Sequence, residues 1–541
     1  MIRLREVALG LVLTAITAGH AVAAAPSDPT VLNAAAPMVT DPALGPATES
    51  IISGALDTAA GPIESALRDK LAGLPTEGTA QEIKERAVLS DFYKARADAP
   101  LWVSENGLSD AGKAIVAEIE NAHDRGLDAK DFPLPDVSAA KDGGALNPDQ
   151  IADAEVTLAL SILKYGRYAR GGRISDPTIL LNSNLDRKPQ LVDPEIVIKG
   201  IASAVEPDAY LRGLNPKHPQ FELLRRAYLK SRGHAAERLL ANMEEWRWMP
   251  DDLGELHILA NVPEFMVYFY KDGKPIHKER IVVGEVGKQT TIFTRNLKTI
   301  VFKPMWRVPE SIKVRELQPN LRRGGSMFRQ YDLELETKDG QPLDYRDIDW
   351  FTADIRDYEV VQPPGRKNVM GVVKFTFPSQ HTIFMHDTVD KWMFAQKTRT
   401  LSHGCLRLRN PMTMAKKVLF EDKGWDAKKV DQTMRDGPKS NEIVIEKKIP
   451  MHLVYFTAWA DDNGRIRTYA DIYGHEKRIT QALQGKWSEI NVGRNHLAPV
   501  GEAPPPSGLT TSSAPSGVRY SHRKQPKTVV DMVGQALGGG F

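Results

Sequence analysis

The sequence predicts an α+β protein of several domains, in which a helical region precedes a β-rich, sandwich-like region. A chain of 541 residues is long enough for roughly three or four domains. Apolar residues recur at helical spacing from about residue 80 to residue 249, and short apolar runs separated by turn residues follow. The hydrophobic fraction of 42% suffices for ordinary globular cores. A formal net charge of +2 is nearly balanced and does not indicate a nucleic-acid partner.

The amino-terminal segment has the pattern of a secretory signal. Arg3 and Arg5 precede an apolar stretch too short to span a bilayer, and Ala21 and Ala23 match the small residues of a signal-peptidase site. We expect residues 1–25 to be a cleaved signal peptide, with an uncleaved membrane anchor as the alternative. No transmembrane segment is expected after cleavage, because no later run approaches the ~18 apolar residues that a membrane helix needs.

Two segments of biased composition flank the expected folded regions. Residues 26–79 are rich in Ala, Pro, Gly, Ser and Thr, which predicts a mostly disordered linker with one helix over residues 49–71. The Pro, Ser and Gly content rises again from residue 485, which predicts a mostly disordered tail over residues 485–541. Within that tail, residues 529–537 could form a short amphipathic helix.

Residues 80–249 are expected to form a helical domain. Ser109 is placed to cap one helix that Gly126 would end, and Asn147 precedes a proline at the start of another. A further helix is expected over residues 221–248. The apolar stripes of these helices are interpreted as core faces.

Residues 250–484 have the pattern of a β-rich domain. Residues 271–274 are expected to turn a hairpin, and so are residues 461–464, which lack the pattern of a calcium loop. The strand-like runs stop for about sixty residues, which predicts an insertion over about residues 304–369. Most of its aromatic residues are expected to form a small core of their own, and the alternative is that they close over a peptide.

The single cysteine of the chain lies in an unusual setting. Cys405 follows Ser402, His403 and Gly404 directly, and His386 lies upstream. A lone cysteine is most often a small buried hydrophobe, but this one is not part of an apolar run, and exported chains usually avoid an unpaired thiol. A thiol attacks as the thiolate and needs a base, which His386 can supply. In a tight turn the backbone amides of His403, Gly404 and Cys405 could form an oxyanion hole.

A metal site is the weaker interpretation of the same residues. His381, His386, His403 and Cys405 carry possible ligand atoms, but their spacing matches no common zinc pattern. We therefore expect neither a metal nor a cofactor.

The motif resembles the signature of L,D-transpeptidases, in which a histidine precedes Ser/Thr-His-Gly-Cys, and the separation between His386 and Cys405 fits that family. The resemblance implies that Cys405 is the acyl-accepting nucleophile and His386 the base. It also implies that the backbone carbonyl of Asp387, where the family often has Gly or Ser, orients the imidazole. Arg407 and Ser402 would contact the substrate, and the alternative for Arg407 is a surface or structural role.

Other segments resemble the large members of that family. Residues 92–102 and 169–173 resemble their helical scaffold region, and the insertion resembles their capping subdomain. A separate peptidoglycan-binding module is expected to be absent, because only residues 229–244 precede the Glu245-Trp246-Arg247-Trp248 segment.

The family resemblance implies a periplasmic enzyme acting on peptidoglycan stem peptides. The donor would be a tetrapeptide stem, cut between its third residue, a diamino acid, and its terminal D-alanine. The acceptor would be the third residue of another stem, which gives 3–3 crosslinks. Outer-membrane proteins are a further possible acceptor, and carbapenems would acylate Cys405.

Three alternatives remain open from the sequence. Water could attack the thioester, which would make the protein an L,D-carboxypeptidase, although a water-excluding lid favours transfer. The acceptor could be a free D-amino acid or the amino terminus of an outer-membrane protein. The chain could also be a non-catalytic cell-wall scaffold. A papain-like protease is disfavoured, because its cysteine precedes its histidine.

Overall fold

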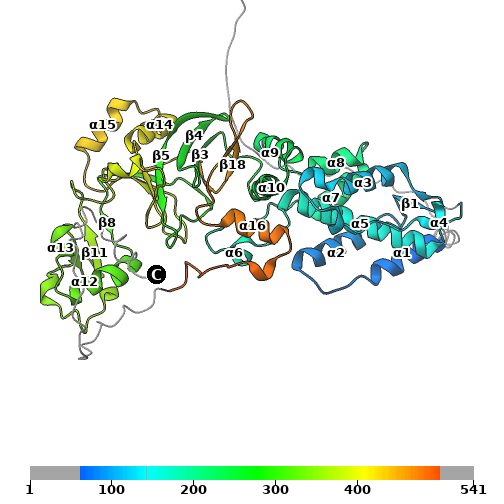
Figure 1. The fold of residues 1–541 in the computed structure, drawn as a ribbon, viewed down its shortest axis with the longest axis horizontal. Helices are drawn as coiled ribbons and strands as arrows, with labels where there is room; N and C mark the ends of the chain where they lie inside the picture. Colours follow the sequence, from blue (N-terminus) through cyan, green and yellow to red (C-terminus); the bar gives the residue numbers. More distant parts are fainter. Residues whose placement is uncertain (1–60, 142, 500–541) are drawn as a thin grey trace, which may run out of the picture. The chain divides into compact units, whose positions relative to one another are not determined.

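The computed structural model describes residues 61–141 and 143–499 (Figure 1). The predicted signal peptide, most of the predicted linker and the possible helix at residues 529–537 lie outside these ranges. Within the described ranges, no helix combines the length and hydropathy that crossing a membrane requires.

The amino-terminal part of the described chain is helical, as predicted (Figure 1). Two very short strands, β1 (Val103–Ser104) and β2 (Gly107–Leu108), form a small hairpin within it. The helices are α1 (Pro62–Ala72), α2 (Ala80–Lys94), α3 (Asp110–Glu120), α4 (Ser138–Lys141), α5 (Pro148–Gly171), α6 (Pro177–Leu180), α7 (Pro194–Ser203), α8 (Pro207–Gly213), α9 (Pro219–Leu229) and α10 (Gly233–Arg247).

Local capping explains where these helices begin. Ser109 accepts a hydrogen bond from the Gly112 N–H at the start of α3, and Asn147 forms a reciprocal capping box with Gln150 at the start of α5. Helix α3 ends at Glu120, earlier than expected, and Gly126 instead closes the 3-10 turn that follows.

Two helix boundaries differ from the predictions. The single helix expected over residues 221–248 is two helices, because the chain breaks before Gly233, whose φ of 56° is a left-handed conformation that glycine adopts without strain. Helix α1 coincides with the end of the helix expected over residues 49–71 and extends one residue beyond it, but it is not part of a linker, because its buried Leu67 and Leu71 belong to the same apolar core as α5. The folded part therefore begins before residue 80.

The carboxy-terminal part contains one large curled sheet. Its strands follow the order β16-β7-β12-β13-β15-β5-β4-β3-β17-β6, and β14 pairs with β5. The strands are β3 (Leu256–Asn261), β4 (Met266–Lys271), β5 (Lys274–Gly284), β6 (Thr294–Asn296), β7 (Thr299–Phe302), β12 (Val373–Thr376), β13 (Met385–His386), β14 (Thr400–Ser402), β15 (Leu406–Leu408), β16 (Asn441–Val444) and β17 (Pro450–Val454).

Both predicted hairpin turns are present. Lys271 pairs with Lys274 across the β4–β5 turn, in which Asp272 and Gly273 have φ values of 48° and 71°. Residues 461–464 connect β18 (Ala458–Ala460) to β19 (Ile466–Thr468).

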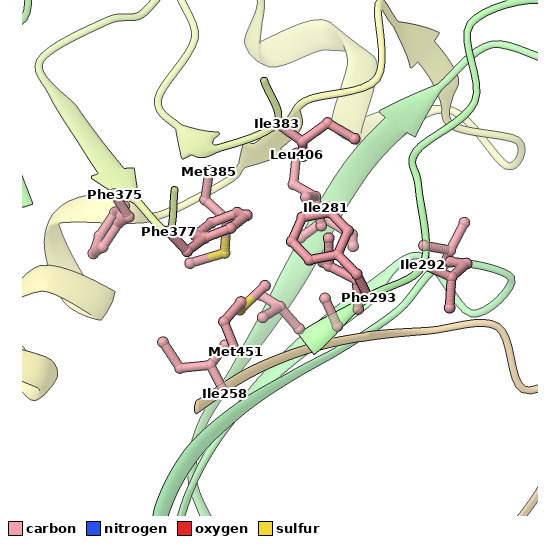
Figure 2. Packing of buried hydrophobic residues seen from close by; sticks show 14 of the residues in the cluster. Ile258, Ile281, Ile292, Phe293, Phe375, Phe377, Ile383, Met385, Leu406 and Met451 are labelled. Atoms are coloured by element: carbon pink, nitrogen blue, oxygen red, sulfur yellow. The ribbon is translucent and has the colours of Figure 1, made fainter. Parts of the chain in front are cut away.

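One face of the large sheet is an apolar core. Figure 2 shows side chains of neighbouring strands, among them Phe375, Met385, Leu406 and Ile281, converging on this core. Helix α14 (Pro411–Lys423) packs against the same cluster, so the sheet face that carries Met385 and Leu406 is closed to solvent. The remaining helices of this part are α15 (Ala427–Asp436) and α16 (His475–Leu483).

The insertion lies between β7 and β12, which pair with each other, so its two ends are neighbours. Strands do not stop here as predicted: four short strands form a separate sheet in the order β10-β9-β11-β8. Strands of two to four residues are too short to give a recognisable alternation in the sequence. The elements, several of which are labelled in Figure 1, are β8 (Trp306–Arg307), α11 (Glu310–Ile312), a π-helical turn (Lys313–Leu317), α12 (Gln318–Arg322), α13 (Met327–Gln330), β9 (Glu334–Glu336), β10 (Pro342–Leu343) and β11 (Glu359–Gln362).

The aromatic residues of the insertion mostly form its own core, as expected. Trp306, Phe328, Tyr331 and Trp350 are buried together, whereas Phe351 is 64% exposed.

The start of the predicted disordered tail also differs from expectation. Beyond residue 485, Asn182 donates a hydrogen bond to the carbonyl oxygen of Val492, so the ordered chain continues past the predicted boundary.

Candidate active site

Cys405 lies at the end of a tight turn between β14 and β15. Gly404 in this turn has a φ of 111°, a conformation that residues with a Cβ rarely adopt. A Cβ at this position would lie 3.3 Å from the carbonyl oxygen of Gln289. The turn before the cysteine therefore requires glycine.

Side-chain hydroxyls hold the turn from two directions. Ser402 Oγ donates to the carbonyl oxygen of Cys405 at 2.6 Å and accepts from the Gly404 N–H at 3.2 Å. Thr290 Oγ1 donates to the carbonyl oxygen of Gly404 at 2.7 Å and accepts from the Gly284 N–H at 2.9 Å. Ser402 is buried, and both of these bonds stay within the turn, so they position it; the substrate contact of Ser402 stays a prediction. The same bond engages the Gly404 amide, one of the three donors expected for the oxyanion hole.

Strand register places the expected base on the same sheet face as the cysteine. In the parallel β13–β15 pair, Met385 lies opposite Leu406 and His386 opposite Arg407. Side chains alternate between the faces of a strand, and Met385 and Leu406 point into the core. His386 and Cys405 therefore share the opposite face. Cys405 is partly exposed.

Both groups are neutral at neutral pH. Burial, and then the nearby Arg407, lower the pKa of His386 to about 3, while its hydrogen bond with the Asp387 backbone acts in the opposite direction. Burial raises the pKa of Cys405 to about 11, although the backbone of Phe384 and the charges of Lys374 and Arg407 favour the thiolate. The resting groups are thus a thiol and a neutral imidazole on one face of the sheet, a state that suits proton transfer during the reaction better than a preformed ion pair.

The Nδ1 atom of His386 is a candidate proton acceptor. It is buried, and within the described residues it has no partner at hydrogen-bond distance.

The Asp387 side chain supports the neighbouring loop. Oδ2 accepts from the Val372 N–H at 3.0 Å, and Oδ1 accepts from the Thr388 N–H at 2.7 Å and from Lys391 Nζ at 2.6 Å. Because the side chain of Asp387 is engaged in these bonds, its backbone makes the hydrogen bond with the His386 imidazole. The predicted role of the Asp387 carbonyl depends on this bond.

Arg407 is buried on the same face as His386 and Cys405. Its Nη1 lies 3.4 Å from Thr388 Oγ1 and 3.5 Å from Asp390 Oδ2. Burial lowers the pKa of Arg407, and Asp390 opposes this effect. This ion pair agrees with the structural part of the alternative for Arg407, and its contact with the substrate stays a prediction.

The four residues of the metal alternative have different surroundings. His381 Nε2 lies 2.8 Å from Asp186 Oδ2, and its Nδ1 lies 2.8 Å from His496 Nε2. His403 Nε2 lies 3.2 Å from Glu316 Oε1. Each of these two histidines is engaged by a separate carboxylate.

Sequence reasoning missed two further neighbours of the cysteine. Lys374 lies opposite His386 in the β12–β13 pair, and its Nζ lies 4.2 Å from the centre of the Phe384 ring. Burial lowers the pKa of this lysine, whereas Cys405 raises it. A lysine in the otherwise apolar run Val372-Val373-Lys374-Phe375 was the available signal. Glu316, from the insertion, gave no signal in the sequence.

Comparisons with known proteins address both parts of the chain. A family described as a scaffold domain matches residues 87–227, and the L,D-transpeptidase catalytic domain family matches residues 255–439. A putative L,D-transpeptidase of Haemophilus influenzae is 25% identical over 416 residues, which cover 74% of this chain and 80% of that protein. A solved structure, the Ldtfm–avibactam carbamoyl enzyme, is 12% identical over 37% of this chain and 49% of its own, and its TM-score of 0.16 is too low to support an argument.

Proposed function

The chain belongs to the L,D-transpeptidase family, and we propose that it transfers an acyl group from a peptidoglycan tetrapeptide stem, through Cys405, to an amine on a second stem. The product would be a 3–3 crosslink. We also propose that residues 1–25 are removed as a signal peptide and that the enzyme works in the periplasm, because an exported enzyme is the one that meets this substrate.

The first half-reaction forms a thioester. His386 takes the proton of the Cys405 thiol as the sulfur attacks the carbonyl carbon between the third residue and the terminal D-alanine. The C–N bond breaks, and D-alanine leaves with the proton from His386. The amides of His403 and Cys405 remain candidates to stabilise the oxyanion, each donor being worth about 3 to 4 kcal/mol in enzymes where one was removed.

The second half-reaction releases the enzyme. The acceptor amine attacks the thioester carbonyl, His386 takes a proton from the amine, and the C–S bond breaks. The thiolate then recovers that proton, and a new amide joins the two stems.

One observation carries this proposal: the β13–β15 register that puts Cys405 and His386 on one sheet face, with Cys405 partly exposed. Arg407 and Lys374 on the same face add positive charge that favours the attacking thiolate.

The proposal is tested by product analysis. Purified protein is incubated with a disaccharide tetrapeptide, and the products are separated by liquid chromatography and mass spectrometry. Dimers linked through two third residues, with one D-alanine released per link, are the expected result. Tripeptide without dimer would identify an L,D-carboxypeptidase instead. The absence of any product from a folded, reduced protein would favour the cell-wall scaffold alternative.

A further inference from the structure

Three acceptor oxygens near the catalytic turn accept no hydrogen bond from the described part of the chain, although Glu285 Oε1 lies 3.6 Å from Lys288 Nζ. Glu285 Oε1, Gln289 Oε1 and Glu316 Oε2 are buried, and within the described residues none has a hydrogen-bond partner. Buried acceptors are normally satisfied, because leaving one unpaired costs roughly 1–3 kcal/mol. We call Glu285, Gln289 and Glu316 the acceptor cluster.

The acceptor cluster surrounds the turn that carries Cys405. Glu316 Oε1 lies 3.2 Å from His403 Nε2 and 3.1 Å from Lys288 Nζ. Lys288 Nζ also lies 3.6 Å from Glu285 Oε1, so the two carboxylates flank one ammonium. The Glu285 N–H donates to the carbonyl oxygen of Ser402 at 2.9 Å, and the carbonyl oxygen of Gln289 packs against Gly404.

Negative charge is concentrated in the acceptor cluster. Burial raises the pKa of Glu316, but the hydrogen bond with His403 and the charge of Lys288 outweigh it and leave the pKa below its usual value. Glu316 is therefore ionised at neutral pH, although its side chain is only 9% exposed. The carboxylates of Glu285 and Glu316 both lie near the ammonium of Lys288, and Glu316 also contacts the imidazole of His403. A buried carboxylate such as that of Glu316 is costly unless it is paired.

We propose that the acceptor cluster is a subsite for an ammonium group of a substrate peptide. An ammonium group supplies three donors and one positive charge, which suit acceptor oxygens without donors and the two carboxylates of the cluster. This inference rests on the proposed function, because a stem with a diamino acid at its third position carries such a group. The group belongs to the donor stem before acyl transfer or to the acceptor stem after it.

Binding to an inactive chain tests the subsite without turnover. Full-length Cys405→Ala protein is titrated calorimetrically with two tetrapeptide stems, one with a free side-chain amine and one with that amine acetylated. The free amine should bind about tenfold more tightly, as expected for a charge-assisted pair. The Glu316→Gln change in this background should abolish most of the difference, whereas Glu334→Gln, at an exposed position of β9, should preserve it.

A second variant separates recognition from folding. Gln289→Ala removes one unpaired oxygen and leaves the contact between Glu316 and His403 intact. It should weaken binding of the free amine severalfold and leave binding of the acetylated stem unchanged. Equal affinity for the two stems, or an undiminished difference in both Glu316→Gln and Gln289→Ala, would overturn the inference and assign the unpaired oxygens to solvent.

Kinetics of the active protein, which retains Cys405, identify whether the donor stem or the acceptor stem provides the ammonium group. If it is the donor, Glu316→Gln should raise the KM for thioester formation. If it is the acceptor, thioester formation should be unchanged and the KM of the amine acceptor should rise. A parent protein that forms no thioester would refute the proposed function, while the titration of Cys405→Ala would still decide whether the subsite exists.

Discussion

Thr290 Oγ1 donates a hydrogen bond to the carbonyl oxygen of Gly404 at 2.7 Å and thereby ties the catalytic turn to the end of β5. The same hydroxyl accepts from the Gly284 N–H, and the Tyr473 hydroxyl donates to the carbonyl oxygen of Gly284 at 2.5 Å. A chain of hydrogen bonds thus connects α16, whose preceding loop carries Tyr473, to the residue before the nucleophile.

Replacing Thr290 by valine should weaken both stability and activity. The nearly isosteric change leaves the Gly404 carbonyl and the Gly284 N–H without this partner, so we expect a loss of roughly 1–3 kcal/mol in the free energy of unfolding. Thioester formation should slow because the turn is less well positioned. Urea unfolding measures the change in the free energy of unfolding, and quenched-time-point assays measure the rate of thioester formation. Thr468→Val, at an exposed position, is the matched control, and equal behaviour of the two variants would refute this role.

Replacing Gly404 by alanine should impair acylation more than overall folding. A φ of 111° strains any residue with a Cβ by roughly 1–3 kcal/mol, and the new methyl group would press on the Gln289 carbonyl. The rate of thioester formation is the measurement. Gly287→Ala provides the control, because a Cβ there meets no atom of the described chain within 4 Å. Normal acylation by Gly404→Ala would show that the turn tolerates a different conformation.

The pH profile of Cys405 alkylation should reflect a neutral resting pair. Because burial raises the pKa of Cys405 to about 11, alkylation by iodoacetamide should keep rising above pH 9. The pKa of His386, at about 3, predicts no step between pH 5 and pH 8. A plateau already reached near pH 7 would indicate a preformed thiolate–imidazolium pair.

Lys374→Met should shift that profile to higher pH. The positive charge of Lys374 favours the thiolate, so its loss should raise the pKa of Cys405 further and slow alkylation at pH 9. Methionine keeps the unbranched chain that packs near Phe384. Lys338→Met, at an exposed position in the insertion, should leave the profile unchanged. An unchanged profile in Lys374→Met would show that this charge does not act on the thiol.

His475→Phe should make the free energy of unfolding depend less on pH under acidic conditions. Burial lowers the pKa of His475 to about 3, compared with an ordinary value near 6.5, and within the described residues neither ring nitrogen has a hydrogen-bond partner. The unfolded chain therefore binds the proton first as pH falls, and this stabilising contribution is complete above pH 6.5 and is lost progressively down to about pH 3. Urea unfolding at pH 7.5 and pH 5 should show a smaller difference in His475→Phe than in the parent. The exposed His234→Phe is the control, and an unchanged difference in His475→Phe would contradict the assignment.

The sequence predicted those helices and hairpins whose ends carry capping residues, proline or glycine. Asn147-Pro148 begins α5, and Asp272-Gly273 turns the β4–β5 hairpin, as expected. The break before Gly233 was missed because one glycine inside an apolar helical pattern is also tolerated in a continuous helix. The small sheet of the insertion was missed because its strands are too short to show periodicity.

Only those residues of the site that lie in or close to the contiguous motif around Cys405 were predictable from the sequence. The short motif around Cys405 and the upstream His386 were singled out, and the β13–β15 register explains how they come to one face. Thr290 and Glu316 reach the same turn from distant segments, and no sequence pattern links them to it. The resemblance implied a substrate contact for Ser402, and nothing in the sequence indicated its two hydrogen bonds within the turn.

Intact-protein mass spectrometry tests directly whether Cys405 is the nucleophile and His386 the base. The parent protein, Cys405→Ala and His386→Ala are each incubated with a tetrapeptide stem and analysed without separation of the products. We expect a thioester adduct on the parent, at the mass of the stem less D-alanine, none on Cys405→Ala, and a slowly forming adduct on His386→Ala. An adduct that persists on Cys405→Ala, or one that forms equally fast on His386→Ala, would contradict these roles.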